Sequence, residues 1–105
     1  MKMIKAIIRP EKEYEVISAL EKEGFYSLSK VDILGRGKQK GIQVGEIVYD
    51  ELAKLMLMVV VEDNAVEQAI ASIKKSAYTG NYGDGKIFVV PVEEAYTIRT
   101  GNPGL

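Results

Sequence analysis

The chain has 105 residues, of which 47% are hydrophobic and 28% charged, and its formal net charge is -1. This length accommodates one globular domain, and the near-neutral charge argues against a nucleic-acid or membrane-surface role. Cysteine and histidine are absent, which excludes disulfides, Cys/His zinc sites and Ser-His-Asp catalysis and shifts the expectation toward binding. The sequence has neither a long apolar run nor a signal sequence, so we expect a cytoplasmic protein.

The first third of the sequence predicts a strand, a helix and a second strand. Residues 3–8 alternate loosely, as in a strand, and Pro10 ends them. Residues 11–23 have helical spacing, and Gly24 follows as the expected helix-ending residue before a strand over 25–34. Ile4, Ala6 and Ile8 would share one side of the first strand, with Met3, Lys5 and Ile7 on the other. The helix would carry an apolar stripe of Tyr14, Val16, Ile17 and Leu20.

The periodic pattern is lost over residues 35–54, which open with Gly35-Arg36-Gly37-Lys38-Gln39-Lys40-Gly41. Loops of about 20 residues are uncommon in compact domains and are usually functional or disordered. Backbone N–H groups and lysine side chains together can cradle phosphate or carboxylate oxygens. A solvated, flexible hairpin has the same composition, and this segment alone does not separate the two interpretations.

The second half predicts strand, helix and strand again. Residues 55–61 form an unbroken apolar run, typical of a strand that is covered on both faces. Asp63 is the expected N-cap of the next helix, with Gly80 as its stop. The expected inner helix residues are Val66, Ala69, Ile70, Ile73 and Ala77.

The C-terminal third begins with the sequence Gly83-Asp84-Gly85-Lys86, which leads into a strand over 87–90. Asp-Gly is a common structural turn that needs no ligand, and the spacing of a Walker A loop is absent. Residues 96–99 predict a fifth short strand, and the last residues resemble a frayed tail. The adjacent Glu93 and Glu94 lack a partner histidine and do not indicate acid-base catalysis.

The order of these elements, βαββαβ, predicts an α+β, ferredoxin-like sandwich with a four-stranded antiparallel sheet and both helices on one face. The other face of the sheet is then uncovered. Because the strand over 55–61 is apolar on both sides, this face should be buried against another protein surface. Identical subunits are the simplest candidate, so we expect a homo-oligomer.

Four motifs, in one order and spacing, resemble the PII signalling proteins of the GlnB and GlnK kind over nearly the whole chain. They are Ile4-x-Ala6-Ile7-Ile8-x-Pro10, Gly35-x-Gly37-x-Gln39-Lys40-Gly41, Thr79-Gly80-x-x-Gly83-Asp84-Gly85-Lys86-Ile87-Phe88-Val89, and Pro91-Val92-Glu93-Glu94-Ala95 followed by Ile98-Arg99-Thr100-Gly101. The resemblance implies a single PII-like domain over 1–105, with a T-loop at 37–54, a B-loop at 79–86 and a C-terminal segment at 91–105.

The resemblance also implies a homotrimer with ATP or ADP bound between subunits. The residues implied at the nucleotide are Gly37, Lys38, Gly83, Asp84, Gly85, Lys86 and Arg99. Gln39 would hold Mg²⁺ between ATP and 2-oxoglutarate, and Gln39, Lys40, Gly41 and Lys54 would bind 2-oxoglutarate. Oxygen ligands suit Mg²⁺, and N–H and ammonium donors suit carboxylates.

Three positions depart from the common PII pattern. Thr97 and Lys38 stand where arginines are usual, which removes one phosphate-facing cation and one forked guanidinium. Ile47 stands where the enterobacterial proteins have the uridylylated tyrosine, and the nearby Tyr49 does not match it, so control by uridylylation is not implied.

The form of this T-loop resembles the archaeal branch associated with nitrogenase, in which paired PII-like proteins act. The implied partner is nitrogenase, contacted through Ile42, Val44, Ile47, Val48 and Tyr49. One alternative is a GlnK-type regulator of an ammonium channel or glutamine synthetase. A remote alternative is a small ferredoxin-like enzyme such as an acylphosphatase, although the phosphate-loop pattern of that family is absent.

Overall fold

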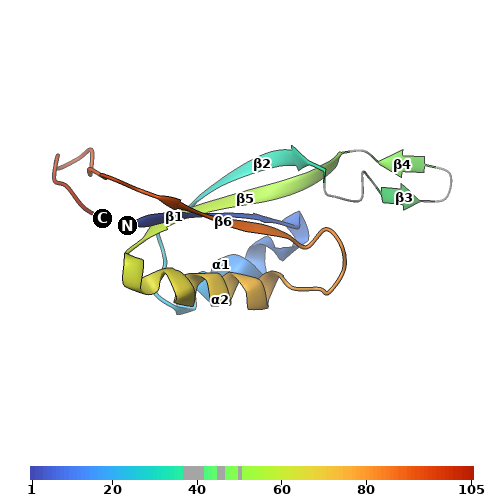
Figure 1. Ribbon diagram of the computed structural model, residues 1–105, viewed down its shortest axis with the longest axis horizontal. Helices are drawn as coiled ribbons and strands as arrows, with labels where there is room; N and C mark the ends of the chain where they lie inside the picture. The colour runs from blue at the N-terminus through green and yellow to red at the C-terminus, as the bar shows by residue number, and fades with distance from the viewer. Residues whose placement is uncertain (37–41, 45–46, 50) are drawn as a thin grey trace.

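The computed structural model describes residues 1–36, 42–44, 47–49 and 51–105. Four strands form one antiparallel sheet in the order β2-β5-β1-β6, and two helices cover one of its faces (Figure 1). The strands are β1 (Lys2–Ile8), β2 (Ser29–Gly35), β5 (Leu52–Val61) and β6 (Gly85–Pro91). The helices are α1 (Glu13–Lys22) and α2 (Val66–Ala77), preceded by the short 3-10 helices η1 (Pro10–Lys12) and η2 (Asp63–Ala65). The predicted ferredoxin-like fold class is confirmed.

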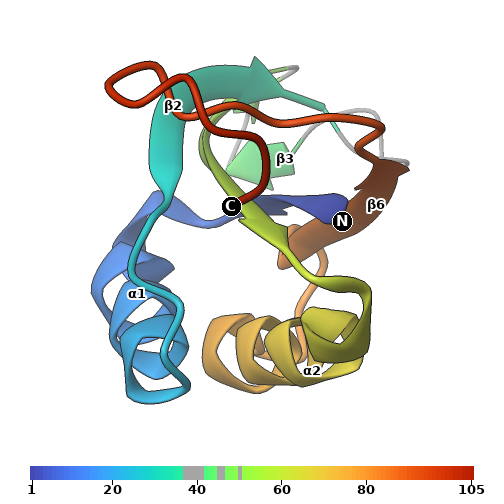
Figure 2. The same cartoon turned by 90° about the vertical axis from the view of Figure 1, so that its left-hand side faces the viewer.

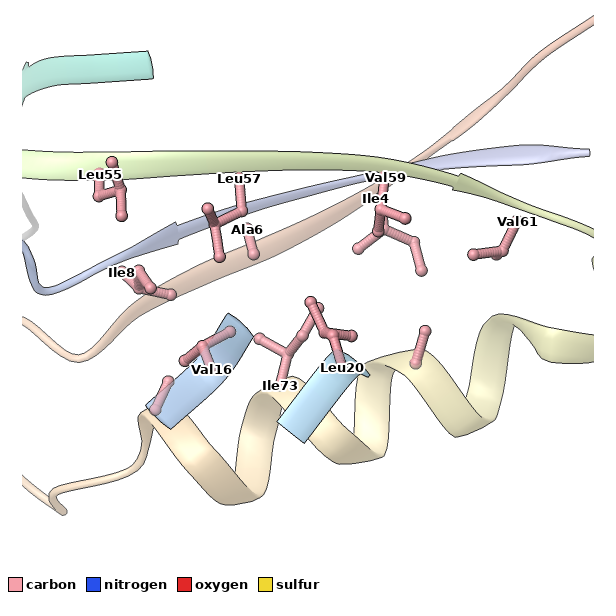
Figure 3. Close-up of a cluster of buried hydrophobic side chains, with 12 residues drawn as sticks. Ile4, Ala6, Ile8, Val16, Leu20, Leu55, Leu57, Val59, Val61 and Ile73 are labelled. Atoms are coloured by element: carbon pink, nitrogen blue, oxygen red, sulfur yellow. The ribbon is translucent and has the colours of Figure 1, made fainter. Parts of the chain in front are cut away.

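The core lies between the sheet and the two helices (Figure 3). Alternate residues of β1 point into it, and antiparallel register places Ile4 opposite Val59 of β5 and Val89 of β6. Each large apolar side chain buried in this way contributes about 1.5–3 kcal/mol. The buried apolar residues are Ile4, Ala6, Ile8, Val16, Leu20, Leu55, Leu57, Val59, Val61, Ala69, Ile73 and Ala77.

One predicted core residue of α1 is wrong. Val16 and Leu20 are fully buried, whereas the Tyr14 side chain is 80% exposed. At 3.6 residues per turn, Val16 and Leu20 share one face, and Tyr14 lies about 140° away from the middle of that face. The inward stripe of α1 is therefore narrower than the sequence indicated.

The start of the second helix also differs from the prediction. Asp63 begins η2, and the N-cap positions are Glu62 for η2 and Ala65 for α2, neither with a side-chain cap bond. The Asp63 carboxylate instead accepts a hydrogen bond from the N-terminal ammonium of Met1 at 2.9 Å. Because the chain start passes beside η2, the carboxylate has a charged partner instead of the helix amides.

Three strand predictions need correction. β2 begins at Ser29 rather than Phe25, and β5 begins at Leu52 rather than Leu55. β5 therefore begins before the apolar run. Its residue Lys54 pairs with Ile33 of β2, and a polar residue is tolerated there because β2 is an edge strand. Within the predicted 37–54 loop, β3 (Ile42–Val44) and β4 (Ile47–Tyr49) form a small antiparallel hairpin.

The fifth strand predicted over 96–99 is wrong. A single bridge joins Tyr96 to Pro103, and the residues between them form a turn. The amide of Thr97 donates to the carbonyl of Asn102 at 2.9 Å, and Gly104 donates to Ala95 at 2.8 Å. The C-terminal segment is thus a folded turn rather than a frayed tail.

The face of the sheet opposite the helices carries a group of apolar side chains. Register places Met56, Met58 and Val60 of β5 on this open face, with Met3 and Ile7 of β1 beside them. The β6 side chain Phe88 is 45% exposed on the same face. The C-terminal segment lies on this side of the sheet, across from the helices (Figure 2). In the described part of the chain, no helix has the length and apolar character needed to span a bilayer.

Candidate functional site

The B-loop connects α2 to β6 and is organised around one carboxylate. The Oδ2 atom of Asp84 accepts hydrogen bonds from the amides of Thr79 at 2.8 Å and Gly80 at 2.9 Å. Its Oδ1 atom accepts from the Thr79 hydroxyl and from Arg9 Nε, the latter at 3.0 Å. These bonds, the Thr79 hydroxyl foremost, hold the pKa of the Asp84 carboxyl well below its usual range. The carboxylate is ionised at neutral pH and fixes the path of the loop.

Two glycines of the B-loop are required by geometry. Gly85 has φ of +113°, and a Cβ atom there would lie 1.7 Å from the carbonyl oxygen of Ile7. Gly83 has φ of +97°, and its Cβ position lies 3.3 Å from Arg9 Nη2 and 3.6 Å from Lys54 Nζ. Glycine therefore allows the loop to approach β1 closely and leaves two cations beside its backbone.

Arg9 belongs to this site, although the sequence analysis did not select it. Its Nη2 donates to the carbonyl of Tyr82 at 2.8 Å, in addition to the Asp84 bond, and Nη1 lies 3.9 Å from Glu11. The order of the strands could have indicated that Arg9 lies at this site. Ile8 pairs with both Leu55 and Gly85, so the residue after Ile8 must lie beside the residues that precede these two partners.

Lys54 reaches the same loop from β5. Its ammonium donates a hydrogen bond to the carbonyl oxygen of Gly83. Burial lowers the pKa of the Lys54 ammonium, and the positive charge of Arg9 lowers it further, while Glu11 and Asp84 act in the opposite direction. Two cations thus converge on one backbone segment, which is the arrangement needed to attract an anion.

The structure brings together four of the residues that the sequence analysis assigned to ligands: Lys54, Gly83, Asp84 and Gly85. Lys86 follows directly in β6 and pairs with Ile7, so it shares the open face of the sheet. Asp84 differs from the expectation in its contacts, because its carboxylate oxygens accept bonds from the loop itself.

Other predicted residues are not brought to this site within one chain. Arg99 belongs to the C-terminal segment, which leaves the opposite end of β6 (Figure 1). Gly37, Lys38, Gln39, Lys40 and Gly41 lie outside the described residues, so the predicted Mg²⁺ ligand is not placed. The backbones of Ile42, Val44, Ile47, Val48 and Tyr49 belong to the β3–β4 hairpin.

Two hollows adjoin the B-loop. One, of about 480 Å³, lies between α2 and β6 and is mostly apolar, with Ile73, Ala77 and Ile87 among its lining residues. The other, of about 520 Å³, is lined by Tyr78, Gly80, Asn81, Tyr82 and Asp84. Among the residues whose positions are given, no three Asp or Glu side chains gather as a metal site. The side-chain chemistry of the site favours anions over metal ions held by protein carboxylates.

Comparison with known proteins identifies the family. The family model for nitrogen regulatory protein P-II matches residues 1–102. The chain is 64% identical, over the full length of both, to "Nitrogen fixation nifHD1 region GlnB-like protein 1" of Methanosarcina barkeri. It is 60% identical, again over full length, to "Nitrogen fixation nifHD region glnB-like protein 1" of Methanococcus maripaludis.

A bacterial relative is more distant. The chain is 47% identical to "Nitrogen regulatory protein P-II" of Azospirillum brasilense, covering 99% of this chain and 96% of that protein. The family match, the fold and the full-length similarity to the archaeal proteins agree with one another. The chain belongs to the nitrogen regulatory protein P-II family, in its archaeal nif-region GlnB-like branch.

Proposed function

We propose that this protein senses ATP or ADP together with Mg²⁺ and 2-oxoglutarate and controls nitrogenase by direct binding. The observation that carries this proposal is the contact between Lys54, at the end of the T-loop, and Gly83 of the B-loop. This contact joins the segment proposed to bind 2-oxoglutarate to the segment proposed to bind nucleotide. Occupancy of one can therefore affect the other, as required of a sensor that integrates two ligands.

The residues present suit anionic ligands. Lys54 and Arg9 supply positive charge beside the B-loop, and Lys86 adds a third cation at the start of β6. Gly83 and Gly85 keep the loop free of side chains, so that phosphate oxygens can approach its backbone. We assign Asp84 to shaping the loop around the nucleotide rather than to contacting it. MgATP, when bound, would supply the divalent cation that attracts the 2-oxoglutarate carboxylates.

The T-loop opening completes the proposed site. Lys38 and Gly37 would extend the nucleotide-binding surface, and Gln39 would add an oxygen ligand for Mg²⁺. The backbone N–H groups of Lys40 and Gly41 would donate to 2-oxoglutarate. In this arrangement Lys54 binds the same ligand from the other end of the loop, so the ligand restricts the loop between its two ends.

A homotrimer is the proposed assembly. The open face of the sheet carries half-buried methionines and the exposed Phe88, a combination that soluble monomers seldom present as one patch. The C-terminal segment that carries Arg99 follows the end of β6 opposite the B-loop (Figure 1), so we infer that Arg99 contacts the B-loop of another copy. The nucleotide site is then formed between subunits.

The proposed output element is the β3–β4 hairpin. It lies beyond the sheet at the end that carries the B-loop (Figure 1). Ile42, Val44, Ile47, Val48 and Tyr49 supply an apolar sequence for contact with a partner. The printed names of the archaeal relatives associate those proteins with nif regions, which favours nitrogenase as the partner. Control of an ammonium channel or glutamine synthetase is the second candidate, in line with the general name of the bacterial relative.

Calorimetry tests ligand sensing. Titration of the purified protein with 2-oxoglutarate should give binding with MgATP and little binding without it. Lys54→Gln should weaken 2-oxoglutarate binding about tenfold or more, since a charge-assisted bond is lost. Lys30→Gln is the matched control, because Lys30 pairs with Glu13 on the helix side of the sheet. Tight binding of 2-oxoglutarate to the nucleotide-free protein would contradict the proposed arrangement.

Affinity capture tests the target. Immobilised protein should retain nitrogenase components in ADP and release them when MgATP and 2-oxoglutarate are added. Deletion of residues 42–49 should abolish retention and leave nucleotide binding intact. Retention of an ammonium channel or glutamine synthetase, with no nitrogenase, would replace the first target by the second.

A further inference from the structure

The open face of the sheet carries charged side chains of one sign. In the strands as the structure describes them, register places no Asp or Glu on this face and three lysines, Lys5 of β1, Lys54 of β5 and Lys86 of β6. Lys54 and Lys86 belong to the site proposed above for anionic ligands. Lys5 lies farther along β1, two residues from Ile7, the partner of Lys86. The open face therefore has one cation that the ligand site does not use.

Lys5 lies in the middle of the apolar group. It pairs with Met58 of β5 on one side and with Phe88 of β6 on the other. Its neighbours on the same face of β1 are Met3 and Ile7. The side chain is half-buried, and its ammonium makes no ion pair with a carboxylate of the described residues. Covering this face would remove water from the ammonium, which is costly unless an anion replaces the water.

A second open face cannot supply that anion, because it presents the same lysine. The C-terminal segment of a second copy can supply it, since this segment lies on the open-face side of its own sheet (Figure 2) and carries Glu94. The Tyr96 hydroxyl donates a hydrogen bond to Oε2 of Glu94 at 3.2 Å. The Glu94 side chain is exposed, and its Oε1 atom can accept a further bond from an ammonium.

We propose that Glu94 of one copy pairs with Lys5 on the open face of the next copy, and that this ion pair selects the orientation in which the copies assemble. The inference rests on the homotrimer of the proposed function and deepens it by naming the residues that orient the subunits. Each copy offers Glu94 to one neighbour and Lys5 to the other. Such a head-to-tail contact is the kind that closes a ring of three.

The length of the chain allows this ion pair together with the contact inferred for Arg99. Arg99 is assigned to the B-loop end of the neighbouring open face, where Lys86 lies. Glu94 precedes Arg99 by five positions, which span at most about 17 Å of extended chain. Along β1, Lys5 lies about 7 Å from Ile7, the partner of Lys86. One C-terminal segment lying along the face can therefore reach both places.

The pair is expected to act on specificity more than on affinity. An ion pair buried in an interface roughly offsets its own desolvation, whereas a buried charge that is unpaired or faces a like charge is costly. Orientations that cover Lys5 with apolar side chains, or with a lysine of the next copy, are therefore disfavoured. The orientation that brings Glu94 to Lys5 remains.

Charge reversal tests the pair, with dissociation of the trimer on dilution followed by light scattering. Lys5→Glu places a carboxylate opposite Glu94, so dissociation should begin at a protein concentration about tenfold or more above that of the wild type. Glu94→Lys should have the same effect. The double variant Lys5→Glu/Glu94→Lys restores opposite charges and should assemble about as tightly as the wild type.

Two single changes of charge are the matched controls. Glu93→Lys makes the change of Glu94→Lys one residue earlier, and Lys22→Glu reverses an exposed lysine on α1, which covers the other face of the sheet. Both should leave assembly close to that of the wild type. If circular dichroism shows a reversed variant to be unfolded, Lys5→Gln and Glu94→Gln take its place. Their effects on dissociation should then be non-additive, the double variant being little worse than either single one.

The inference is overturned if the wild type is a trimer and Lys5→Glu assembles as tightly as the wild type. Restoration of Lys5→Glu by Glu93→Lys, and not by Glu94→Lys, would overturn it as well, because the partner of Lys5 would be a different carboxylate. A wild type that stays monomeric at micromolar concentration would instead contradict the proposed trimer, and the ion pair with it. The two failures are distinguished by the wild type alone.

Discussion

The B-loop and the C-terminal turn lie at opposite ends of β6 and are held in different ways. The B-loop is tied by side chains from other parts of the chain, Arg9 and Lys54. The C-terminal turn is closed by bonds within residues 94–104, such as Thr97 to Asn102. A loop held by the sheet is shaped before any ligand arrives. A turn closed only upon itself leaves its apolar side chain, Ile98, fully exposed.

This difference indicates which region is complete within one chain. The B-loop has its carboxylate, Asp84, paired with Arg9, and the same carboxylate fixes the backbone at Thr79 and Gly80. The C-terminal turn presents Ile98 and Arg99 to solvent. Large exposed apolar residues in groups mark interaction surfaces. The contrast is consistent with the proposed trimer, in which the turn of one subunit meets its neighbour.

Gly85→Ala should have the largest effect and tests how tightly the B-loop is tied. The new methyl group would lie 1.7 Å from the Ile7 carbonyl oxygen, and φ is +113°. Because the contact is with backbone, we expect a loss of about 3 kcal/mol or more in the free energy of unfolding. Urea denaturation measures it.

Gly101→Ala is the matched change in the C-terminal turn. Its φ is +73°, but no atom lies within 4 Å of the new methyl group. The expected cost is therefore only that of placing alanine in the left-handed backbone region, a loss of about 1–2 kcal/mol in the free energy of unfolding. Equal losses for the two variants would show that the two loops do not differ in how tightly they are held.

Ile98→Ser should act on assembly rather than on folding. Ile98 is fully exposed in a single chain, so its replacement should change the free energy of unfolding of the subunit by less than about 0.5 kcal/mol. In a trimer it should promote dissociation on dilution, measured by light scattering. Tyr14→Ser, at a residue 80% exposed on α1, is the control and should leave assembly unchanged. Dissociation of both variants alike would argue against a specific role for the turn.

The layers of the fold were predictable from the sequence, because each strand and helix buries one face at its own period. The alternation places Ile4, Ala6 and Ile8 on one side of β1, and the structure buries that side. The prediction of a strand at 96–99 was wrong because, within the described residues, this segment has no neighbouring strand to pair with. A strand needs a partner, and the short β-like sequence after Pro91 pairs only through the Tyr96–Pro103 bridge.

The site was predictable where its residues form local sequence motifs, and not where it depends on contacts between distant strands. The glycines and lysines of the loops are visible as local motifs, and Lys54, Gly83 and Gly85 do converge. The role of Arg9 depends on register between β1 and β6, which has no local signature. The use of Asp84 by the loop itself depends on the fold of residues 79–84, so the sequence indicated a ligand contact where the structure has an internal one.

Acidification tests the central carboxylate of the B-loop. The pKa of Asp84 is depressed by its hydrogen bonds, so the contribution of this group to stability is present above the pKa of an unfolded Asp, about 3.9, and is lost as pH falls through the lower folded value. Amide exchange at Thr79 and Gly80, corrected for intrinsic rates, should stay slow at pH 4. Asp84→Asn should exchange faster at every pH. Faster exchange in the wild type already at pH 5 would contradict this pairing.

Alkaline titration gives the smallest expected effect and separates the two cations of the site. The pKa of Lys54 lies below its ordinary value of about 10.4, through burial and then Arg9, while Glu11 and Asp84 partly compensate. Since the charged ammonium binds a carboxylate, affinity for 2-oxoglutarate at saturating MgATP should fall as pH rises through this lowered value. In Arg9→Gln one cause is removed, the pKa of Lys54 rises, and the fall in affinity should move to higher pH. Lys30→Gln should leave the profile in place, because Lys30 pairs with Glu13 away from the site. An unchanged profile in Arg9→Gln would mean that Arg9 does not act on Lys54 electrostatically and that its influence is confined to the shape of the B-loop.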